Sequence, residues 1–202
     1  MTRANNLTYD LLKFMKDKGC WQVRIGIESG EQKVLDFIKK GITIQQVTNA
    51  ANWCHKLKIK MSGFFMVGHH IDTVETINKT IDYALSIPLT DVIVTINTPI
   101  PGTESYLKAR EYGTYDDRDI TKLNCWNPVF IPHGLTADIL MQKQAEFYRR
   151  FYLRPRVIMS QMSKITNPKV LFTMMKNAAM GITFLLKSNS NRKKGLAGSL
   201  AN

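Results

Sequence analysis

Three apolar segments of strand length alternate with amphipathic segments, and this alternation restricts the fold more than any other feature of the sequence. The segments QVRIGI (22–27), MSGFFMV (61–67) and DVIVTI (91–96) are rich in β-branched and other apolar residues. Strands that are joined by helices pair in parallel, because a helical crossover returns the chain to the same end of the sheet. We therefore predict an α/β fold that is built on a parallel sheet.

Helical periodicity is expected between and around these strands, at 8–18, 31–40, 43–57, 74–86, 103–112 and 136–153. Thr43 and Gln46 have the spacing of a capping box, in which each side chain bonds the backbone amide of the other. Three strands are too few to close a barrel, which usually takes over about 200 residues. The edges of such a sheet must be covered, either by a larger protein or by the chain's own C-terminal helices.

Charge is distributed unevenly along the 202 residues, which carry a net charge of +12. All 16 acidic residues precede position 151, whereas residues 151–202 hold nine basic residues and no acidic one. We predict a boundary near 150. Residues 1–150 would form a balanced α/β domain, and residues 151–202 a basic, Met-rich helical extension with a frayed end.

Three interpretations of the basic extension are open. A helix over 157–187 can pack over the open sheet, or the segment 156–187 can make a peripheral contact with an anionic membrane. Nucleic-acid binding is the least favoured, because the basic residues alternate with Met and Leu rather than with stacking aromatic residues.

Cys20, Cys54 and Cys125 are too far apart in the sequence for a metal knuckle, and their odd number does not suit a disulfide framework. A reducing, cytoplasmic setting is therefore expected. The longest uncharged runs, 41–55 and 123–137, are shorter than the roughly 20 apolar residues of a spanning helix. No membrane-spanning helix is predicted.

Polar residues, glycines and prolines follow each predicted strand, at 28–30, 68–73 and 97–103. Because the carboxyl ends of parallel strands meet at one edge of the sheet, where α/β folds bind their ligands, we predict a ligand site there. Glu28 is the leading candidate, since a carboxylate at the end of an apolar strand is costly to bury. The alternative is that Glu28 only stabilises the start of the next helix.

The second of these turns contains His69, His70 and Asp72, which have the chemistry of metal ligands. Adjacent histidines point in different directions, however, and no third partner is suitably spaced. Hydrogen bonding within the loop is favoured over a metal site. Pro99 and Gly102 can simply shape the third turn. No nucleophile triad, phosphate-binding glycine loop or zinc motif is found in the sequence.

Four motifs in order resemble the radical S-adenosylmethionine (SAM) enzymes: GIESGEQKVLDFIKKGIT (26–43), FFMVGHHIDTVETINKTIDYA (64–84), NTPIPGTESY (97–106) and RRFYLRP (149–155). The likeness is strongest to the cobalamin-binding branch, which includes the anaerobic magnesium-protoporphyrin ester cyclases. It implies the C-terminal part of a partial (β/α)6 TIM-type barrel, in which SAM and a 4Fe-4S cluster lie at the carboxyl ends of the strands. The three predicted strands would be the fourth to the sixth.

The resemblance also implies roles for individual residues. Glu28 and Ser29 match positions that face SAM, whose ammonium and ribose hydroxyl groups donate hydrogen bonds to a carboxylate. The cofactor-binding candidates are Arg3, Glu28, Ser29, Gly68, Pro99, Gly102 and Thr103. His70 stands where the family's turn usually has proline, which leaves the shape of that loop open. No catalytic residue and no metal ligand is assigned.

The family's Cys-x3-Cys-x2-Cys motif, which holds the cluster, does not occur in the sequence. We expect a C-terminal portion of a longer or split protein, inactive alone, whose partner is an N-terminal half with the cluster loop and a cobalamin domain. In the intact enzyme, the resemblance implies reductive cleavage of SAM to a 5′-deoxyadenosyl radical, with cobalamin-dependent methyl transfer or cyclisation. One alternative is a non-catalytic basic module that binds a membrane surface or an acidic partner. A weaker one is a radical SAM tRNA-modifying enzyme.

Overall fold

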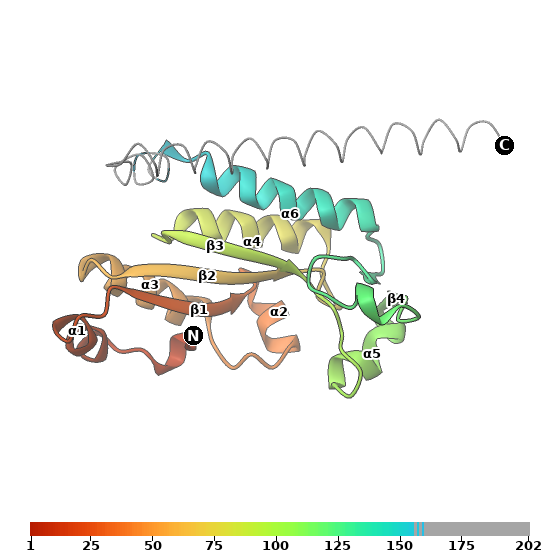
Figure 1. Ribbon diagram of the computed structural model, residues 1–202, viewed down its shortest axis with the longest axis horizontal. Coiled ribbons are helices and arrows are strands. Elements are labelled where there is room, and N and C mark those ends of the chain that lie inside the picture. The colour runs from red at the N-terminus through yellow and green to blue at the C-terminus, as the bar shows by residue number, and fades with distance from the viewer. Residues whose placement is uncertain (156, 158, 160–202) are drawn as a thin grey trace. The chain divides into compact units, whose positions relative to one another are not determined.

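A computed structural model describes residues 1–155, 157 and 159 (Figure 1). One compact unit spans Met1–Arg154. The basic extension predicted for 151–202, including the proposed membrane contact through 156–187, lies almost wholly outside the described residues. Within the described part of the chain, no helix is both long enough and apolar enough to cross a membrane.

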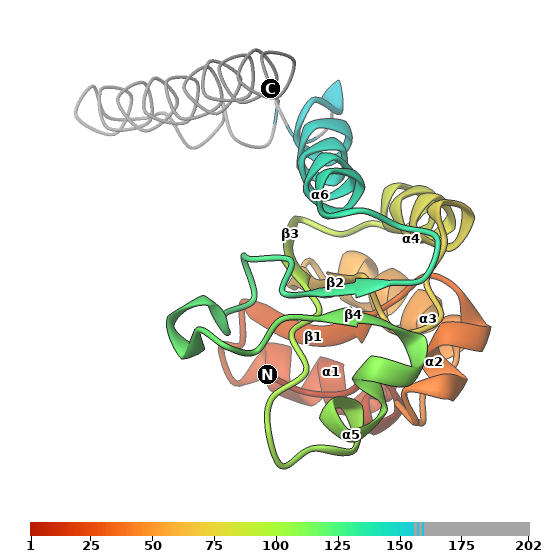
Figure 2. The same ribbon diagram turned by 90° about the vertical axis from the view of Figure 1, so that its right-hand side faces the viewer.

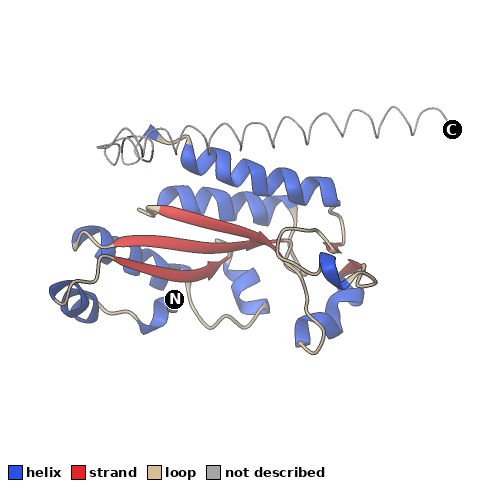
Figure 3. Cartoon of the chain, viewed as in Figure 1, coloured by secondary structure: helices blue, strands red, loops and turns tan. Residues whose placement is uncertain are grey.

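A parallel sheet of three strands forms the centre of the compact unit (Figure 3). Its strands are β1 (Gln22–Glu28), β2 (Lys60–Val67) and β3 (Asp91–Ile96), in the order β1-β2-β3. Both neighbouring pairs are parallel, which confirms the predicted α/β class. Each strand also lies within a residue or so of its predicted position. The core combines fully buried strand residues such as Ile25, Phe65 and Val94 with helical residues that pack on them.

The described residues contain six α-helices: α1 (Tyr9–Asp17), α2 (Gln32–Phe37), α3 (Ile44–Lys56), α4 (Val74–Ser86), α5 (Glu104–Tyr112) and α6 (Ala137–Tyr152). Five of them begin after a threonine whose side chain accepts a backbone N–H; these are Thr8, Thr43, Thr73, Thr103 and Thr136. The capping box of Thr43 and Gln46 is present as predicted. The helix α2 is shorter than expected, since Lys39 and Gly41 after it have left-handed backbone angles (φ 52° and 65°).

The free edge of β3 is covered by α6. The hydroxyl of Tyr148 accepts a hydrogen bond from Val94 N (2.9 Å) and donates one to Val94 O (3.1 Å). The Gln144 amide also donates to Val94 O, at 2.8 Å. The exposed backbone groups of an edge strand otherwise invite pairing with another chain. Side chains of α6, the last helix of the described residues, thus cover one of the edges that the sequence left open.

The opposite edge of the sheet, beside β1, is paired at a single residue. Thr2 forms a parallel bridge with Ile25, in which Thr2 N donates to Arg24 O at 2.9 Å. Gly26 N donates to Thr2 O at 3.4 Å. The chain therefore enters the fold beside β1 and in the same direction, at the place that a further parallel strand would take.

A second, antiparallel sheet was not expected from the sequence. It consists of β4 (Gly113–Tyr115) and β5 (Phe130–Pro132), and it lies with α5 beyond the carboxyl ends of β1–β3 (Figures 1 and 2). Two short 3₁₀ helices, η1 (Ala4–Asn6) and η2 (Ile120–Lys122), complete the described elements. Because α5 lies past the strand ends, it borders the edge where a ligand site was predicted.

Candidate functional site

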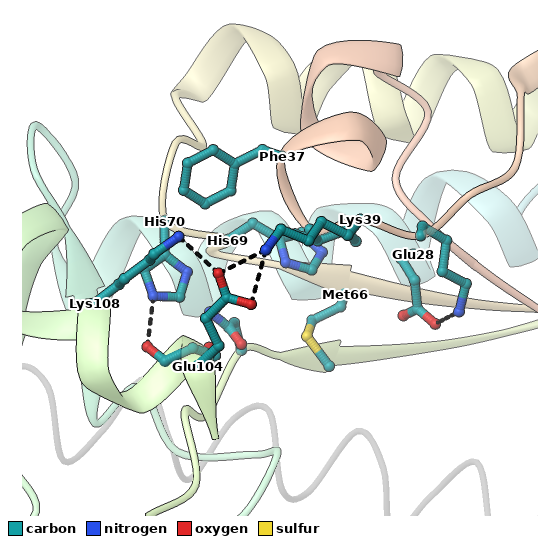
Figure 4. A pocket seen from close by; sticks show the side chains of 12 residues that line it. Glu28, Phe37, Lys39, Met66, His69, His70, Glu104 and Lys108 are labelled. Atoms are coloured by element: carbon teal, nitrogen blue, oxygen red, sulfur yellow. Dashed lines mark hydrogen bonds and ion pairs between the residues drawn. The ribbon is translucent and has the colours of Figure 1, made fainter. Parts of the chain in front are cut away.

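A cavity of about 350 Å³ lies at the carboxyl edge of the sheet (Figure 4). Its lining residues come from the ends of all three strands, from the end of α2 and from α5; they are Glu28, Phe37, Ile38, Lys39, Lys40, Met66, His69, His70, Asn97, Glu104, Ser105 and Lys108. Figure 4 shows Glu28 on one side and Glu104 on the other, with Met66 and His69 between them in this view. The three strand ends therefore meet around one space, as parallel pairing requires.

Glu28 ends β1 and contributes a carboxylate to the cavity wall. Its backbone is left-handed (φ 68°), and the pairing of β1 with β2 is irregular between Gly26 and Glu28. The carboxylate oxygen Oε1 accepts a hydrogen bond from Lys40 Nζ at 2.6 Å, and both side chains are about four-fifths buried. A Cβ at Gly26 would lie 2.9 Å from each of these two atoms. The glycine thus leaves room for a charged pair to lie over the strand.

Ser29 is buried beside Glu28 and does not line the cavity. Its hydroxyl lies 3.0 Å from Thr80 Oγ1 and accepts a hydrogen bond from Glu31 N at 3.1 Å. Gly30 N donates to the same Thr80 oxygen at 3.0 Å. In this structure Ser29 joins the end of β1 to α4, whereas the resemblance implied that it faces SAM.

The turn after β2 is organised by Asp72. One carboxylate oxygen accepts from Gly68 N and His69 N, both at 2.9 Å, and the other accepts from Thr76 Oγ1 at 2.7 Å. Burial raises the pKa of Asp72 to about 6 despite these hydrogen bonds. Asp72 therefore shapes the loop, as the favoured interpretation held. No group of three or more His, Cys, Asp or Glu side chains able to hold a metal ion is found among the described residues.

The two adjacent histidines have different environments. His70 Nε2 lies 2.9 Å from Ser105 O, and its ring packs against Phe130 and Tyr112. His69 is 4 % exposed, and its Nε2 atom has no hydrogen-bond partner. Burial lowers the pKa of His69 to about 4, so the imidazole is neutral near pH 7.

Asn97, the first residue after β3, is buried (7 % exposed), and its Nδ2 atom also has no hydrogen-bond partner. The sequence had placed Asn97 in the third polar turn without assigning it a role. Its position directly after a predicted strand was the signal that could have identified it. The backbone N–H of Asn97 donates to Val67 O at 2.9 Å, which fixes the residue at the sheet edge.

The remaining residues that the resemblance named lie outside the cavity lining. Thr103 caps α5, and Tyr115 Oη donates to Pro99 O at 2.5 Å. Gly102 has φ 89° in the turn between Pro99 and Thr103. Gly68, also left-handed, lies against Leu140 rather than the cavity, and Arg3 is an exposed residue before η1. Of the seven candidates, Glu28 lines this cavity.

The lysines of the cavity were missed in the sequence because none of them follows a strand: Lys39 and Lys40 come after the end of α2, and Lys108 lies within α5. Glu104, at the first turn of α5, bonds Lys39 (2.8 Å) and Lys108 (2.8 Å). Hydrogen bonds from these two ammonium groups lower the pKa of Glu104 to about 2. The link between Lys39 and Glu104 joins the end of α2 to α5 beside the cavity. It depends on tertiary contacts, since 65 positions separate the two residues.

The family model described as the radical SAM superfamily matches residues 1–84. The chain is 32% identical over 161 residues to "Uncharacterized methyltransferase PH0819" of Pyrococcus horikoshii, covering 78% of this chain and 34% of that protein. It is 25% identical over 170 residues to the bacteriochlorophyllide d C-8(2)-methyltransferase of Chlorobaculum tepidum, covering 83% of this chain and 37% of the relative.

A third relative is the anaerobic magnesium-protoporphyrin IX monomethyl ester cyclase of Cereibacter sphaeroides, with 28% identity over 76% of this chain and 25% of that protein. The chain thus spans 25–37% of the length of these relatives. The solved structure of an N-terminally deleted Elp3 from Methanocaldococcus infernus has a similar fold, with a TM-score of 0.53 and 16% identity over 76% of this chain and 41% of that one. This chain belongs to the radical SAM superfamily.

Proposed function

We propose that this chain supplies the SAM-binding side of a radical SAM enzyme that transfers a methyl group or closes a ring. The observation that supports the proposal most directly is the Glu28 carboxylate, held by Lys40 at the end of a parallel strand and exposed to a cavity. The names of the relatives, two methyltransferases and a cyclase, support the reaction class. Cobalamin dependence is part of the proposal, through the likeness to those tetrapyrrole enzymes.

The residues of the cavity suit SAM. Its volume of about 350 Å³ falls in the usual range of small-molecule sites. Glu28 can accept hydrogen bonds from ribose hydroxyls or the ammonium group, and Met66 and Phe37 offer apolar surface to a purine ring. When bound, SAM supplies the group that is cleaved from its sulfonium sulfur. The part of this chain is to position the nucleoside and to exclude water around it.

The residues do not suit a 4Fe-4S cluster. Such a cluster is held by cysteine thiolates, and the three cysteines here are scattered in the sequence and free in the structure. We therefore infer that the cluster ligands and the cobalamin domain lie in another segment of the same or a separate chain. We expect this chain alone to bind SAM without cleaving it. The scattered free cysteines also favour a reducing, cytoplasmic setting.

Calorimetric titration of the full chain with SAM tests the binding proposal. Wild type should bind, and Glu28→Gln should weaken the affinity roughly tenfold, because a hydrogen bond to a charged group contributes about 1.5–3 kcal/mol. Glu111→Gln, an exposed substitution outside the cavity lining, is the matched control and should bind like wild type. Absence of SAM binding by wild type, or equal affinity of Glu28→Gln, would overturn the proposal.

Reconstitution with iron and sulfide tests the inference that the cluster ligands lie outside this chain's own residues. The chain alone should yield no stable 4Fe-4S absorbance, and SAM in the presence of a reductant should remain intact. A stable cluster chromophore on the isolated chain would show that its own residues hold the cluster.

A further inference from the structure

Two residues that line the cavity each carry a buried polar atom without a hydrogen-bond partner, and they come from neighbouring strand ends. His69 Nε2 follows β2 and Asn97 Nδ2 follows β3, and these are the two side-chain atoms of this kind among the described residues. A buried polar group without a hydrogen bond costs about 1–3 kcal/mol. Native proteins retain few such groups, and those that they retain call for an explanation.

The neighbours of both residues show that this edge of the sheet is otherwise well bonded. His70, next to His69, has its Nε2 atom 2.9 Å from Ser105 O. Thr98, next to Asn97, donates to Asn124 O at 2.9 Å. Asp72 accepts two hydrogen bonds from the backbone of the same turn and one from Thr76 in α4. The two unpartnered atoms thus both belong to residues of the cavity lining, where a ligand is the available source of a hydrogen-bond partner.

The chemistry of the pair points to an oxygen acceptor. The Asn97 amide nitrogen is a hydrogen-bond donor, and a neutral imidazole donates from Nε2 in its Nε2–H tautomer. The cavity lining holds three lysines, Lys39, Lys40 and Lys108, against two glutamates, Glu28 and Glu104, which leaves one positive charge in excess. Two donors in a cavity of net positive charge favour an anionic oxygen over a cation or an apolar group.

We propose that His69 and Asn97 form a subsite that binds a carboxylate group of the ligand. The inference deepens the proposed function, on which it rests in taking this cavity as the ligand site. The carboxylate can belong to the methionyl part of SAM or to the second substrate, and both present the same two oxygens to the pair.

Formate is the simplest probe of such a subsite. In the full chain, formate should shift the ¹⁵N signal of the His69 ring and the side-chain amide signal of Asn97, and the shifts should saturate. Asn97→Asp, which replaces the donor by a carboxylate of the same shape, should abolish the response at His69. His69→Gln should retain the response at the Asn97 amide, because the glutamine amide can donate, and His69→Leu should lose it. Asn6→Asp, an exposed substitution in η1, is the matched control.

Unfolding of the ligand-free variants gives a second readout. Asn97→Leu removes an unpaired polar group and should leave the midpoint of thermal unfolding equal to or above that of wild type. Thr98→Val removes a bonded hydroxyl and should lower it. The inference is overturned if saturating formate leaves both side-chain signals unmoved, or if Asn97→Leu lowers the midpoint as much as Thr98→Val does.

Competition identifies the source of the carboxylate. If SAM displaces formate, the subsite holds the SAM carboxylate; if both bind together, it holds that of the second substrate. If formate binds and SAM does not, the subsite stands and the proposed function fails.

Discussion

Glu28 and Lys40 form an ion pair of 2.6 Å across twelve positions of sequence, with both side chains about four-fifths buried. Glu28 ends β1, and Lys40 lies in the turn that follows α2. The pair thus fixes the carboxylate in the cavity wall and anchors the turn to the sheet. A left-handed backbone at a non-glycine residue such as Glu28 costs of order 1–3 kcal/mol, so the surrounding contacts must maintain it.

Removal of Lys40 should destabilise the fold, because it leaves a largely buried carboxylate without its cation. For Lys40→Met we expect a loss of about 1–3 kcal/mol in the free energy of unfolding, measured in urea. The double variant Glu28→Gln/Lys40→Met should recover part of this loss. The exposed pair Lys13–Asp17, at 3.4 Å, is the matched control. In a double-mutant cycle, its interaction energy should be below about 0.5 kcal/mol. Equal couplings for the two pairs would contradict a special role for Glu28–Lys40.

Ser29→Ala should lower stability and leave SAM affinity unchanged, because the hydroxyl bonds Thr80 and the Glu31 amide rather than the cavity. The expected loss is about 1–2 kcal/mol. Thr80→Val should cost a similar amount, and the two losses should not add, since the residues share a hydrogen bond. Urea unfolding and calorimetry with SAM measure the two properties separately. A change in affinity at unchanged stability would restore Ser29 to the ligand-facing role that the resemblance implied.

Gly30→Ala should be more harmful than Gly19→Ala. A Cβ at Gly30 would lie 2.6 Å from Tyr83 Cβ and 2.8 Å from Thr80 Cα, so α4 would have to move away from β1. At Gly19 there is open space, and the left-handed angle of 92° costs only about 1–2 kcal/mol. We expect a loss of roughly 3 kcal/mol or more at Gly30. Circular dichroism during thermal unfolding would rank the two variants, and the reverse order would show that β1 and α4 are not in close contact.

The stability of the fold should depend on pH through two groups of opposite sign. Burial raises the pKa of Asp72 from 3.8 to about 6. The contribution of Asp72 to the free energy of unfolding is therefore complete below pH 3.8 and is lost as the pH rises through 6. Burial lowers the pKa of His69 from 6.5 to about 4, so its contribution is complete above pH 6.5 and is lost as the pH falls through 4. The nearby charges of Glu28 and Lys40 modify the His69 pKa in opposite directions. Burial also lowers the pKa of His70.

Single variants should separate these contributions. Asp72→Asn should show a free energy of unfolding that rises between pH 4 and 6.5, whereas His69→Gln should show a smaller rise or a fall. Each proton contributes at most about 1.4 kcal/mol per pH unit. Urea titrations at a series of pH values provide the measurement, and the same slope in both variants would contradict the assignment.

Tyr148→Phe should weaken the protection of the β3 edge. The hydroxyl bonds both Val94 N and Val94 O, so its removal leaves a backbone amide unpaired and should cost about 1–3 kcal/mol. Hydrogen exchange at the Val94 amide should accelerate in step with that loss. Tyr9→Phe is the matched control, since Tyr9 at the start of α1 makes a cation–π contact through its ring rather than its hydroxyl. Unchanged exchange at Val94 would show that α6 does not protect this edge.

The sequence alone determined the local structure and the order of the elements. Apolar runs at 22–27, 61–67 and 91–96 became the three parallel strands, and threonines before the helices became their caps. These features depend on side-chain periodicity and on hydrogen bonds between residues three positions apart, so they are encoded within short windows. The meeting of the strand ends followed from parallel pairing, and Glu28 could be proposed for that reason.

Only the tertiary structure decided which side chains line the cavity. Lys39 and Glu104 are 65 positions apart, and Ser29 and Thr80 are 51 apart, so no local pattern announces either contact. The short strands β4 and β5 escaped prediction for the same reason, since three residues carry too little periodicity. The unpartnered atoms of His69 and Asn97 also emerge only in the fold. Whether a polar atom is satisfied depends on everything that packs around it, and that is a property of the assembled chain.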